Sequence, residues 1–346
     1  MTIFPPDSLP SLIIAIVVIF ASHSITMGIF GTKWNPNGKH CYVTGGSSGL
    51  GLEVAINLTK KGAHVSIVAR NVEVLAAALE TLESHRVSPD QRLAMYSFPL
   101  NTGEGSAAAL HAACEPFGGR VVDAAFLCAG SSQPDWFVNM DEAALLKGME
   151  QGYWVQAFSA LEIVKLTAQQ EFKGGKIVFV GSTLSYMSFA GFASYAPAKH
   201  ALRGLADTLR NELLLYSTSV HILGAPTMNS PGYVNEMKTK PRIVAEIEGE
   251  DGHPMDKVAE TLVSDVARGR NHIAHDLITD LFRVSTRGSA PQHNFVMDAI
   301  LGLIAWVGVP IWRWDTDRKL RGHREEHRQY LQDKGIIKGA PSMNSK

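Results

Sequence analysis

The sequence contains little cysteine and almost no net charge. Its 346 residues include three cysteines, and the formal net charge at pH 7 is −1. The spacings between Cys41, Cys114 and Cys128 match no metal-binding framework, so we expect buried thiols in a reducing compartment and no metal site. Acidic and basic residues are mixed along the chain, which excludes a basic nucleic-acid surface and predicts no nucleic-acid partner.

Charged residues are also missing from a long stretch near the start of the chain. Residues 9–30 carry none, and a helix needs roughly 20 apolar residues to cross a bilayer. We predict a membrane anchor over residues 1–33 rather than a signal peptide, because no lysine or arginine precedes the stretch and no clear cleavage site follows it. Lys33 and Lys39 follow the span, which places the rest of the chain in the cytosol. Polar residues at 22–26 also allow a tilted or partly interfacial helix.

A second apolar stretch, residues 295–312, lies in the C-terminal segment 286–346. Asp298, Gly308 and Pro310 interrupt it, so it is too broken for a clear membrane span. We predict a membrane-dipping helix or hairpin; an apolar helix packed on the domain or on a second subunit is the alternative. The prediction rests on tryptophans and basic residues in an arrangement typical of membrane interfaces: Trp306, Trp312, Trp314, Arg313, Arg318, Lys319, Arg321 and Arg324.

Between these two segments, residues 38–285 alternate short apolar runs with longer helical stretches. This alternation predicts an α/β fold with a Rossmann-type, doubly wound parallel sheet. The predicted strands are residues 40–44, 64–69, 93–98, 124–128, 176–181 and 220–224. The predicted helices are residues 50–61, 72–83, 107–117, 143–170 and 195–216.

A glycine-rich turn joins the first predicted strand to the first helix. The segment from Thr44 to Gly51 has the sequence TGGSSGLG. Gly45 permits a tight turn, Gly49 lets the backbone approach a pyrophosphate, and Gly51 lets the helix pack closely on the strand. The helix N-terminus then points amide groups at the phosphates, so the turn predicts a dinucleotide site.

Arg70 follows the second predicted strand, where an enzyme that uses NAD usually has an acidic residue for the ribose 2′-hydroxyl. An arginine suits a 2′-phosphate instead, and Ser47 and Ser48 can add hydroxyl contacts to it. We therefore predict NADPH as the cofactor, although Arg70 as a plain surface residue is the alternative.

A second group of residues predicts proton transfer. Tyr195 and Lys199 are four residues apart at the start of a predicted helix and share one face, and Pro197 fits only in this first turn. A lysine ammonium close to a phenol lowers the pKa of the phenol, which favours proton exchange near neutral pH. Ser182 follows the strand at 176–181 and places a hydroxyl at the carboxyl end of the sheet, where open α/β proteins bind ligands.

These motifs, in this order, resemble those of the short-chain dehydrogenase/reductase family over residues 38–235. The resemblance implies a reductase in which Tyr195 protonates the carbonyl oxygen, Ser182 polarises the carbonyl and Lys199 binds the nicotinamide ribose. It also implies cofactor contacts beyond the turn: Thr44, Asn101 near the adenine, Ala129 and Gly130 after the fourth strand, and Ser230 near the carboxamide. One position departs from the family, because Gly152 aligns with an asparagine that holds a relay water, and Gln151 is a candidate substitute.

Within the family, the sequence resembles reductases that convert 3-ketosphinganine to sphinganine at the endoplasmic reticulum membrane. The similarity lies in the apolar N-terminus, in the segment from Gly191 to Leu213 and in the run that ends at Gly232. The similar reductases have acidic residues at two positions of that run, where this sequence has Thr227 and Asn229. The resemblance implies a long-chain sphingoid ketone as substrate and membrane lipids as partners.

Two other functions remain open from the sequence. One is reduction of another lipid ketone, such as a steroid or a 3-ketoacyl-CoA, for which Lys238, Lys240 and Arg242 would supply a basic patch. The other is a non-catalytic NADPH-binding scaffold.

Acidic residues also lie near Lys238, Lys240 and Arg242, and one of them could pair with a substrate amine: Glu236, Glu246, Glu248, Glu250 and Asp251. The family resemblance also implies a homodimer or tetramer formed through the helices at 143–170 and 195–216.

Overall fold

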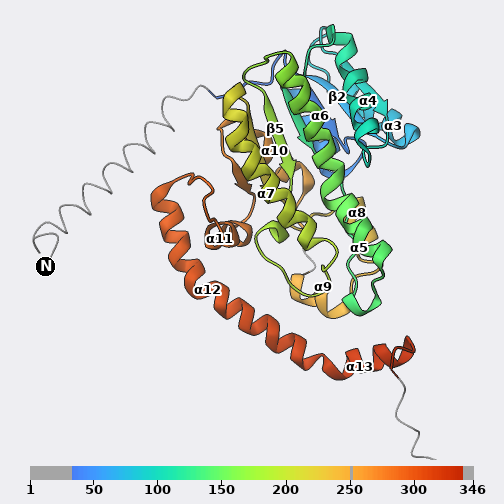
Figure 1. Cartoon of the computed structure of the whole chain (residues 1–346), viewed down its shortest axis with the longest axis vertical. Helices are drawn as coiled ribbons and strands as arrows, with labels where there is room; N and C mark the ends of the chain where they lie inside the picture. Colours follow the sequence, from blue (N-terminus) through green and yellow to red (C-terminus); the bar gives the residue numbers. More distant parts are fainter. Residues whose placement is uncertain (1–32, 250–251, 338–346) are drawn as a thin grey trace, which may run out of the picture.

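The computed structural model describes residues 33–249 and 252–337, which form an α/β fold around one parallel sheet (Figure 1). The seven strands are ordered β3-β2-β1-β4-β5-β6-β7, with the chain order reversing at β1 and β4. The strands are β1 His40–Thr44, β2 His64–Ala69, β3 Leu93–Ser97, β4 Ala124–Leu127, β5 Lys176–Val180, β6 Ser219–Gly224 and β7 His272–Ala274. The predicted Rossmann-type sheet is confirmed, and the reversal places a ligand crevice at the carboxyl ends of β1 and β4.

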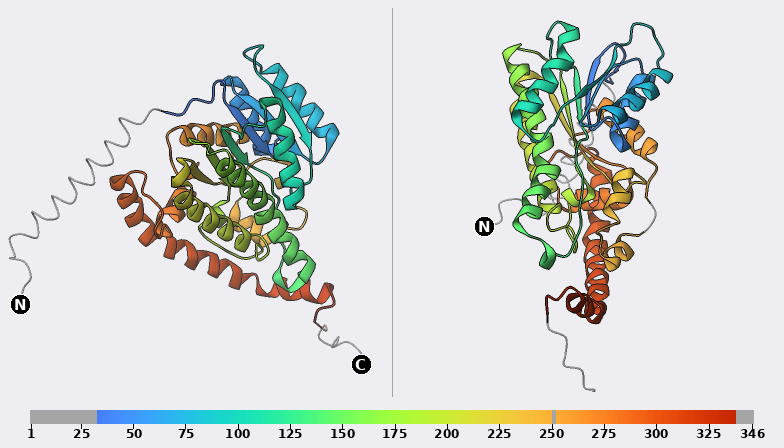
Figure 2. Two further views of the ribbon diagram at one scale, coloured as in Figure 1. Left: turned by 45° about the horizontal axis from the view of Figure 1, so that its top comes forward. Right: turned by 90° about the vertical axis from the view of Figure 1, so that its right-hand side faces the viewer.

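Helices cover both faces of the sheet (Figure 2). On one face α2 (Gly49–Lys60), α3 (Val72–Ser84) and α10 (Met255–Ala267) pack on alternate strand residues such as Cys41 and Val43. On the other face α4 (Gly103–Cys114), α6 (Val155–Gln169) and α7 (Ala196–Glu212) pack on residues such as Tyr42. Because both faces are buried, most strands are largely apolar runs rather than alternating ones, which is the pattern that made them recognisable in the sequence.

The predicted strands and helices all occur near their predicted positions, whereas the helices between residues 231 and 285 were not predicted, and two further differences concern the sheet and the site. The three-residue strand β7 was not predicted, because so short a run has no periodicity to detect. The single helix predicted over residues 143–170 is α5 (Glu142–Met149) and α6, joined by a π-helical turn at Glu150–Trp154. Such turns occur often at functional sites, and this one carries Gly152.

The C-terminal apolar stretch, predicted as a helix or hairpin, is a helix. Residues 295–312 belong to one continuous 28-residue helix, α12 (Phe295–Gly322), with Pro310 inside it. Asp298 does not interrupt α12, because its carboxylate pairs with Arg283 of α11 (Leu277–Ser285) at 2.7 Å, and both side chains are buried. Two short helices, α8 (Pro231–Glu236) and α9 (Arg242–Glu248), follow β6, and α13 (Arg324–Asp333) follows α12. The predicted N-terminal span at 9–30 lies outside the described residues.

Candidate active site

A single cleft of about 1010 Å³ opens at the carboxyl end of the sheet. It extends from the N-terminus of α2 to Trp312 of α12. Of the residues predicted for the site, Thr44 alone does not line it; those that do are Gly45, Ser47, Ser48, Gly49, Gly51, Arg70, Asn101, Ala129, Gly130, Ser182, Tyr195, Lys199 and Ser230. We call the α2 side the nucleotide end and the α12 side the substrate end.

The glycine turn at the nucleotide end has no room for side chains at Gly45, Gly46 and Gly51. A Cβ on Gly45 would lie 2.9 Å from the Ala129 backbone, and one on Gly51 would lie 2.3 Å from the Gly45 carbonyl oxygen. Gly45 and Gly49 also adopt φ angles of +66° and +58°, which favour glycine. A Cβ on Gly49 would meet open space, so here the backbone itself faces the cleft.

The N-terminus of α2 fits the phosphates of a dinucleotide. Ser48 is its N-cap residue, and its side chain makes no capping hydrogen bond. The first amides of α2 thus remain available to an anion, and Ser47 and Ser48 lie beside them. Arg70 is exposed at the end of β2 on the same side of the cleft, and Asn101 donates a hydrogen bond to Glu150.

Thr44 and Gly130 shape the floor of the nucleotide end. Thr44 is fully buried, and its hydroxyl accepts a hydrogen bond from the Ala129 amide at 3.3 Å, which ties the ends of β1 and β4 together. Gly130 allows a close approach, because a Cβ there would lie 2.9 Å from the Gln151 carbonyl oxygen and 3.9 Å from the Lys199 Nζ. Thr44 therefore supports the site from below, whereas Ala129 and Gly130 face the cleft.

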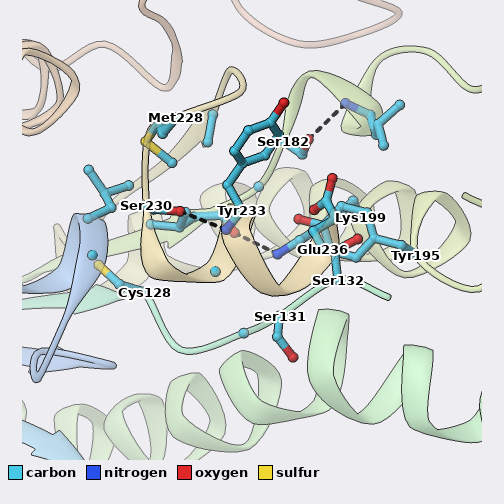
Figure 3. A pocket seen from close by; sticks show the side chains of 18 of the residues that line it. Cys128, Ser131, Ser132, Ser182, Tyr195, Lys199, Met228, Ser230, Tyr233 and Glu236 are labelled. Carbon is cyan, nitrogen blue, oxygen red and sulfur yellow. Dashed lines mark hydrogen bonds between the residues drawn. The ribbon is translucent and has the colours of Figure 1, made fainter. Parts of the chain in front are cut away.

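Ser182, Tyr195 and Lys199 converge at the middle of the cleft (Figure 3). Ser182 caps the short 3₁₀ turn Thr183–Ser185 that follows β5, where its hydroxyl accepts from the Leu184 amide at 3.2 Å. Tyr195 precedes the first residue of α7, and Lys199 lies in its first turns. The Lys199 Nζ donates to the Val180 carbonyl oxygen at 2.9 Å and lies 5.4 Å from the centre of the Tyr195 ring.

Lys199 was predicted to lower the pKa of the Tyr195 phenol, but burial has the opposite effect. Burial raises the pKa of Tyr195 above its usual range, the Glu236 carboxylate adds to this, and the Ser182 hydroxyl opposes it. Burial lowers the pKa of Lys199 to about 7. The phenol is therefore held protonated at neutral pH, whereas the lysine is poised between its two states.

The substrate end has an apolar wall that the sequence did not predict. It combines Phe189 and Phe192 from the loop before α7, Phe282 from α11 and Trp312 from α12. The ring centroids of Phe282 and Trp312 are 5.0 Å apart, and those of Phe189 and Phe192 are 5.4 Å apart. Local patterns give no signal for this wall, because residues far apart in the chain form it.

Charged residues of α8 and α9 form the other side of the substrate end. Lys240 is buried between Glu236 and Glu248, with its Nζ 2.6 and 2.5 Å from their carboxylates. Arg242 pairs with Glu246 and Glu326. Lys240 and Arg242 are thus engaged by acidic partners, which argues against the basic patch considered for an acyl-CoA. Glu250 and Asp251 lie outside the described residues.

Comparisons with known proteins agree with this geometry. Residues 39–240 match the family model described as short chain dehydrogenase. The chain belongs to this family. The 3-ketodihydrosphingosine reductase TSC10 of Cryptococcus neoformans var. neoformans serotype D is 39% identical over 332 residues, covering 95% of this chain and 98% of that protein. The 3-ketodihydrosphingosine reductase of Dictyostelium discoideum is 32% identical and covers 79% of this chain and 85% of its own.

Solved structures support the fold. Levodione reductase superposes with a TM-score of 0.62 at 21% identity, covering 69% of this chain and 96% of its own. A putative short-chain alcohol dehydrogenase from Sinorhizobium meliloti gives a TM-score of 0.59 at 24% identity, covering 69% of this chain and 95% of its own. At these identities the likeness concerns the fold alone.

The structure explains the departure at Gly152 from the family pattern. A Cβ at this position would lie 2.6 Å from the Cβ of Ala198 on α7, so a larger side chain does not fit. The Gln151 side chain instead accepts a hydrogen bond from the Ser131 hydroxyl at 2.8 Å. The Gln151 carbonyl oxygen and the Lys199 Nζ both lie within 4 Å of the position that a Cβ on Gly130 would take.

The run from Pro226 to Gly232 departs from the subfamily pattern at two positions. Thr227 donates a hydrogen bond to Glu248 at 2.8 Å, so this position contacts a carboxylate instead of supplying one. Asn229 donates to the Gly252 carbonyl oxygen and holds the loop. Ser230 caps α8 by accepting from the Tyr233 amide at 3.1 Å, while still facing the cleft.

The three cysteines are free, and none forms a disulfide. Cys128 lines the cleft, and burial raises the pKa of its thiol to about 12. Burial also raises the pKa of Cys114 to about 11. Because the thiolate is the reactive form, these two thiols are unreactive at neutral pH.

Proposed function

We propose that this protein reduces 3-ketosphinganine to sphinganine with NADPH, a step in sphingolipid biosynthesis. The observation that carries the proposal is the continuity of the cleft, in which Tyr195 lies between a phosphate-binding end and an apolar end. The relatives named 3-ketodihydrosphingosine reductase support this substrate, because the 39% identity of one of them extends over 95% of the chain.

Three side chains carry out the proton chemistry in this proposal. Tyr195 donates the phenol proton to the carbonyl oxygen, and its raised pKa keeps that proton in place until it is needed. Ser182 donates a hydrogen bond to the same oxygen and orients the ketone. Lys199 binds the ribose hydroxyls and reprotonates Tyr195, for which its pKa of about 7 is well matched. The bound cofactor would supply the hydride.

A proton route to solvent starts at Lys199 and continues past Gly130. The Gln151 carbonyl oxygen and the Lys199 Nζ lie 2.9 and 3.9 Å from the position that a Cβ on Gly130 would take, and in this proposal a water bridges them. In this proposal the π-helical turn at Glu150–Trp154 replaces the family asparagine, because it turns a backbone carbonyl toward the lysine.

The choice of NADPH over NADH rests on Arg70. Ala69 ends β2, Arg70 and Asn71 follow it, none of the three is acidic, and all three line the nucleotide end. A guanidinium at this place attracts the 2′-phosphate of NADPH, whereas a ribose 2′-hydroxyl offers it no charge. The amides of α2, with Ser47 and Ser48, would hold the remaining phosphates.

We further propose that α12 lies in the plane of the endoplasmic reticulum membrane, on its cytosolic side. The helix is long and apolar enough to cross a bilayer, but it runs along one edge of the domain (Figures 1 and 2), and 17% of its apolar window is buried. Asp298, Leu301, Ala305 and Thr316 are buried on that face. Beyond α12, His323 stacks on Trp136, so the far end is attached as well.

The outer face of α12 is apolar and exposed. Val296, Ile300, Leu303, Val307, Ile311 and Trp314 recur at helical spacing on this face and are between 47% and 71% exposed. Trp306 beside them is 79% exposed, and basic residues follow at Arg318, Lys319 and Arg321. An apolar face with tryptophan and adjacent basic residues suits the lipid interface.

The same helix also connects the membrane to the cleft. Because Trp312 of α12 lines the cleft, a lipid ketone would enter from the membrane. The predicted anchor at residues 1–33 would add a second attachment.

Pairing of subunits through α6 and the end of α7 remains a proposal from the family resemblance. Trp154 and Leu161 on the α6 side are 42% and 47% exposed. Leu214 and Leu215, just beyond α7, are 66% and 81% exposed. Exposed apolar residues on adjacent elements favour a homodimer or tetramer.

Oxidation of NADPH by the full chain in detergent, with 3-ketosphinganine as substrate, tests the proposed activity. We expect turnover, and a loss of about 100-fold or more in Tyr195→Phe, because general acid catalysis typically contributes that much. Tyr216→Phe, beyond α7, serves as the control and should retain activity. If only a long-chain 3-ketoacyl-CoA is reduced, that thioester replaces 3-ketosphinganine as the substrate. NADPH binding without turnover of either ketone would favour the non-catalytic scaffold.

A further inference from the structure

The substrate end contains a built site for an ammonium group. The Nζ of Lys240 lies 2.6 Å from Glu236 and 2.5 Å from Glu248. It also lies 4.9 Å from the centre of the Tyr233 ring and 5.5 Å from that of Phe192. Carboxylates combined with aromatic faces are the surroundings that bind ammonium ions. The ammonium of the chain itself occupies this cage, which shows that its geometry suits such a group.

The cage carries more negative charge than Lys240 neutralises. Two carboxylates surround one ammonium, which leaves a net charge of −1. Burial raises the pKa of Glu236, so this carboxylate gains from any second cation. Thr227 donates to one oxygen of Glu248 while Lys240 binds the other, so Glu248 is already held on both sides. Glu236 is therefore the carboxylate better placed to take a further partner.

Glu236 also lies close to the reacting centre. It is the charged group with the largest effect on the pKa of Tyr195, and Figure 3 places the two side chains together at the cleft. In a 2-amino-3-ketone the nitrogen is attached to the carbon next to the carbonyl. A ketone held by Tyr195 and Ser182 therefore brings its amine near the same carboxylate.

We propose that Glu236, supported by Glu248 and Lys240, binds the protonated 2-amino group of the substrate. This inference rests on the proposed function and adds the feature that selects a sphingoid ketone over other long-chain ketones. Lys240 holds the two carboxylates in place and limits the repulsion between them. Thr227 and Asn229 stand where the similar reductases have acidic residues. In this proposal Glu236 of α8 and Glu248 of α9 supply the carboxylates instead.

Two substrates with the full chain in detergent test the proposal. One is 3-ketosphinganine, and the other is the matching 1-hydroxy-3-ketone, which has the same chain and no amine. In the wild type we expect kcat/KM to be about 10- to 100-fold higher for the amine, the range that a charged hydrogen bond contributes. This comparison needs no variant, so misfolding cannot obscure it. Equal kcat/KM for the two ketones would overturn the inference but leave the reductase intact, whereas turnover of neither would remove the proposed function itself.

Glu236→Gln provides the second comparison. We expect it to lower kcat/KM for the amine about 10- to 100-fold and to change that of the amine-free ketone less than about threefold. Glu246→Gln is the matched control, because Glu246 lies on α9 in the same segment but pairs with Arg242 at the surface. An equal loss for both substrates in Glu236→Gln would show a structural role only and would contradict the proposal, as would no loss for either.

Discussion

The two ends of the cleft are built from different parts of the chain and from different atoms. Backbone forms the nucleotide end: the glycine turn, the amides of α2 and the strand ends at Thr44 and Ala129 all precede residue 131. Side chains form the substrate end, and they come from the loop before α7 and from α8, α9, α11 and α12. A site made of backbone is sensitive to an added Cβ, whereas a site made of side chains is tuned by their charge and shape. The first end suits a fixed cofactor and the second a particular ketone.

The largest effect should follow an added methyl group at the nucleotide end. The Cβ of Gly51→Ala would lie 2.3 Å from the Gly45 carbonyl oxygen, so the phosphate-binding turn must shift. We expect KM for NADPH to rise about 100-fold, because overpacking of this kind costs roughly 1–3 kcal/mol and also moves the amides of α2. Steady-state kinetics with NADPH, alongside thermal unfolding, would measure the change.

Gly204→Ala is the matched control for this substitution. Gly204 lies within α7, where a Cβ would meet open space, so alanine should leave KM for NADPH unchanged. It should also stabilise the fold by about 0.5–1 kcal/mol, because alanine is the better helix former. A Gly51→Ala variant with normal KM would contradict the view that backbone spacing defines this end.

Arg70 tests whether any side chain contributes strongly at the nucleotide end. We expect Arg70→Ala to lower kcat/KM for NADPH about tenfold and to leave that for NADH nearly unchanged, because the exposed guanidinium interacts with the 2′-phosphate through solvent-screened charge. Lys60→Ala, which removes a cation from the other end of α2, is the control. An equal fall with both cofactors would indicate that Arg70 supports the fold rather than selecting NADPH.

The contrast also explains which parts could be predicted from the sequence. The glycine turn, the strands and the spacing of Tyr195 and Lys199 are local patterns, and the fold places them as the patterns predict. The π-helical turn at Glu150–Trp154 was missed because its apolar periodicity continues that of the helices on either side.

The apolar wall was missed because it depends on docking between distant segments. Trp312 contacts Phe282 because α12 packs on α11, where the buried pair of Arg283 and Asp298 joins the two helices. In the sequence, Asp298 interrupts an apolar stretch, and its partner fifteen residues earlier gives no signal. Lys240 was likewise considered for a basic patch in one alternative function, although its side chain is buried between carboxylates that only the fold brings together. Burial also reversed the pKa shift expected for Tyr195.

The smallest effect should come from the outer face of α12, which extends the substrate end toward the membrane. The double substitution Leu303→Ser and Trp306→Ser removes two side chains that are 71% and 79% exposed and do not line the cleft. We expect about a fivefold lower rate on 3-ketosphinganine embedded in vesicles that contain anionic lipid, because each side chain contributes only part of its apolar area to the interface. The rate on substrate dispersed in detergent should be unchanged. Val87→Ser, an exposed apolar residue in the loop before β3, is the control and should alter neither rate. Equal losses in vesicles and in detergent would mean that the outer face supports the fold, and no loss in vesicles would mean that it does not meet the lipid.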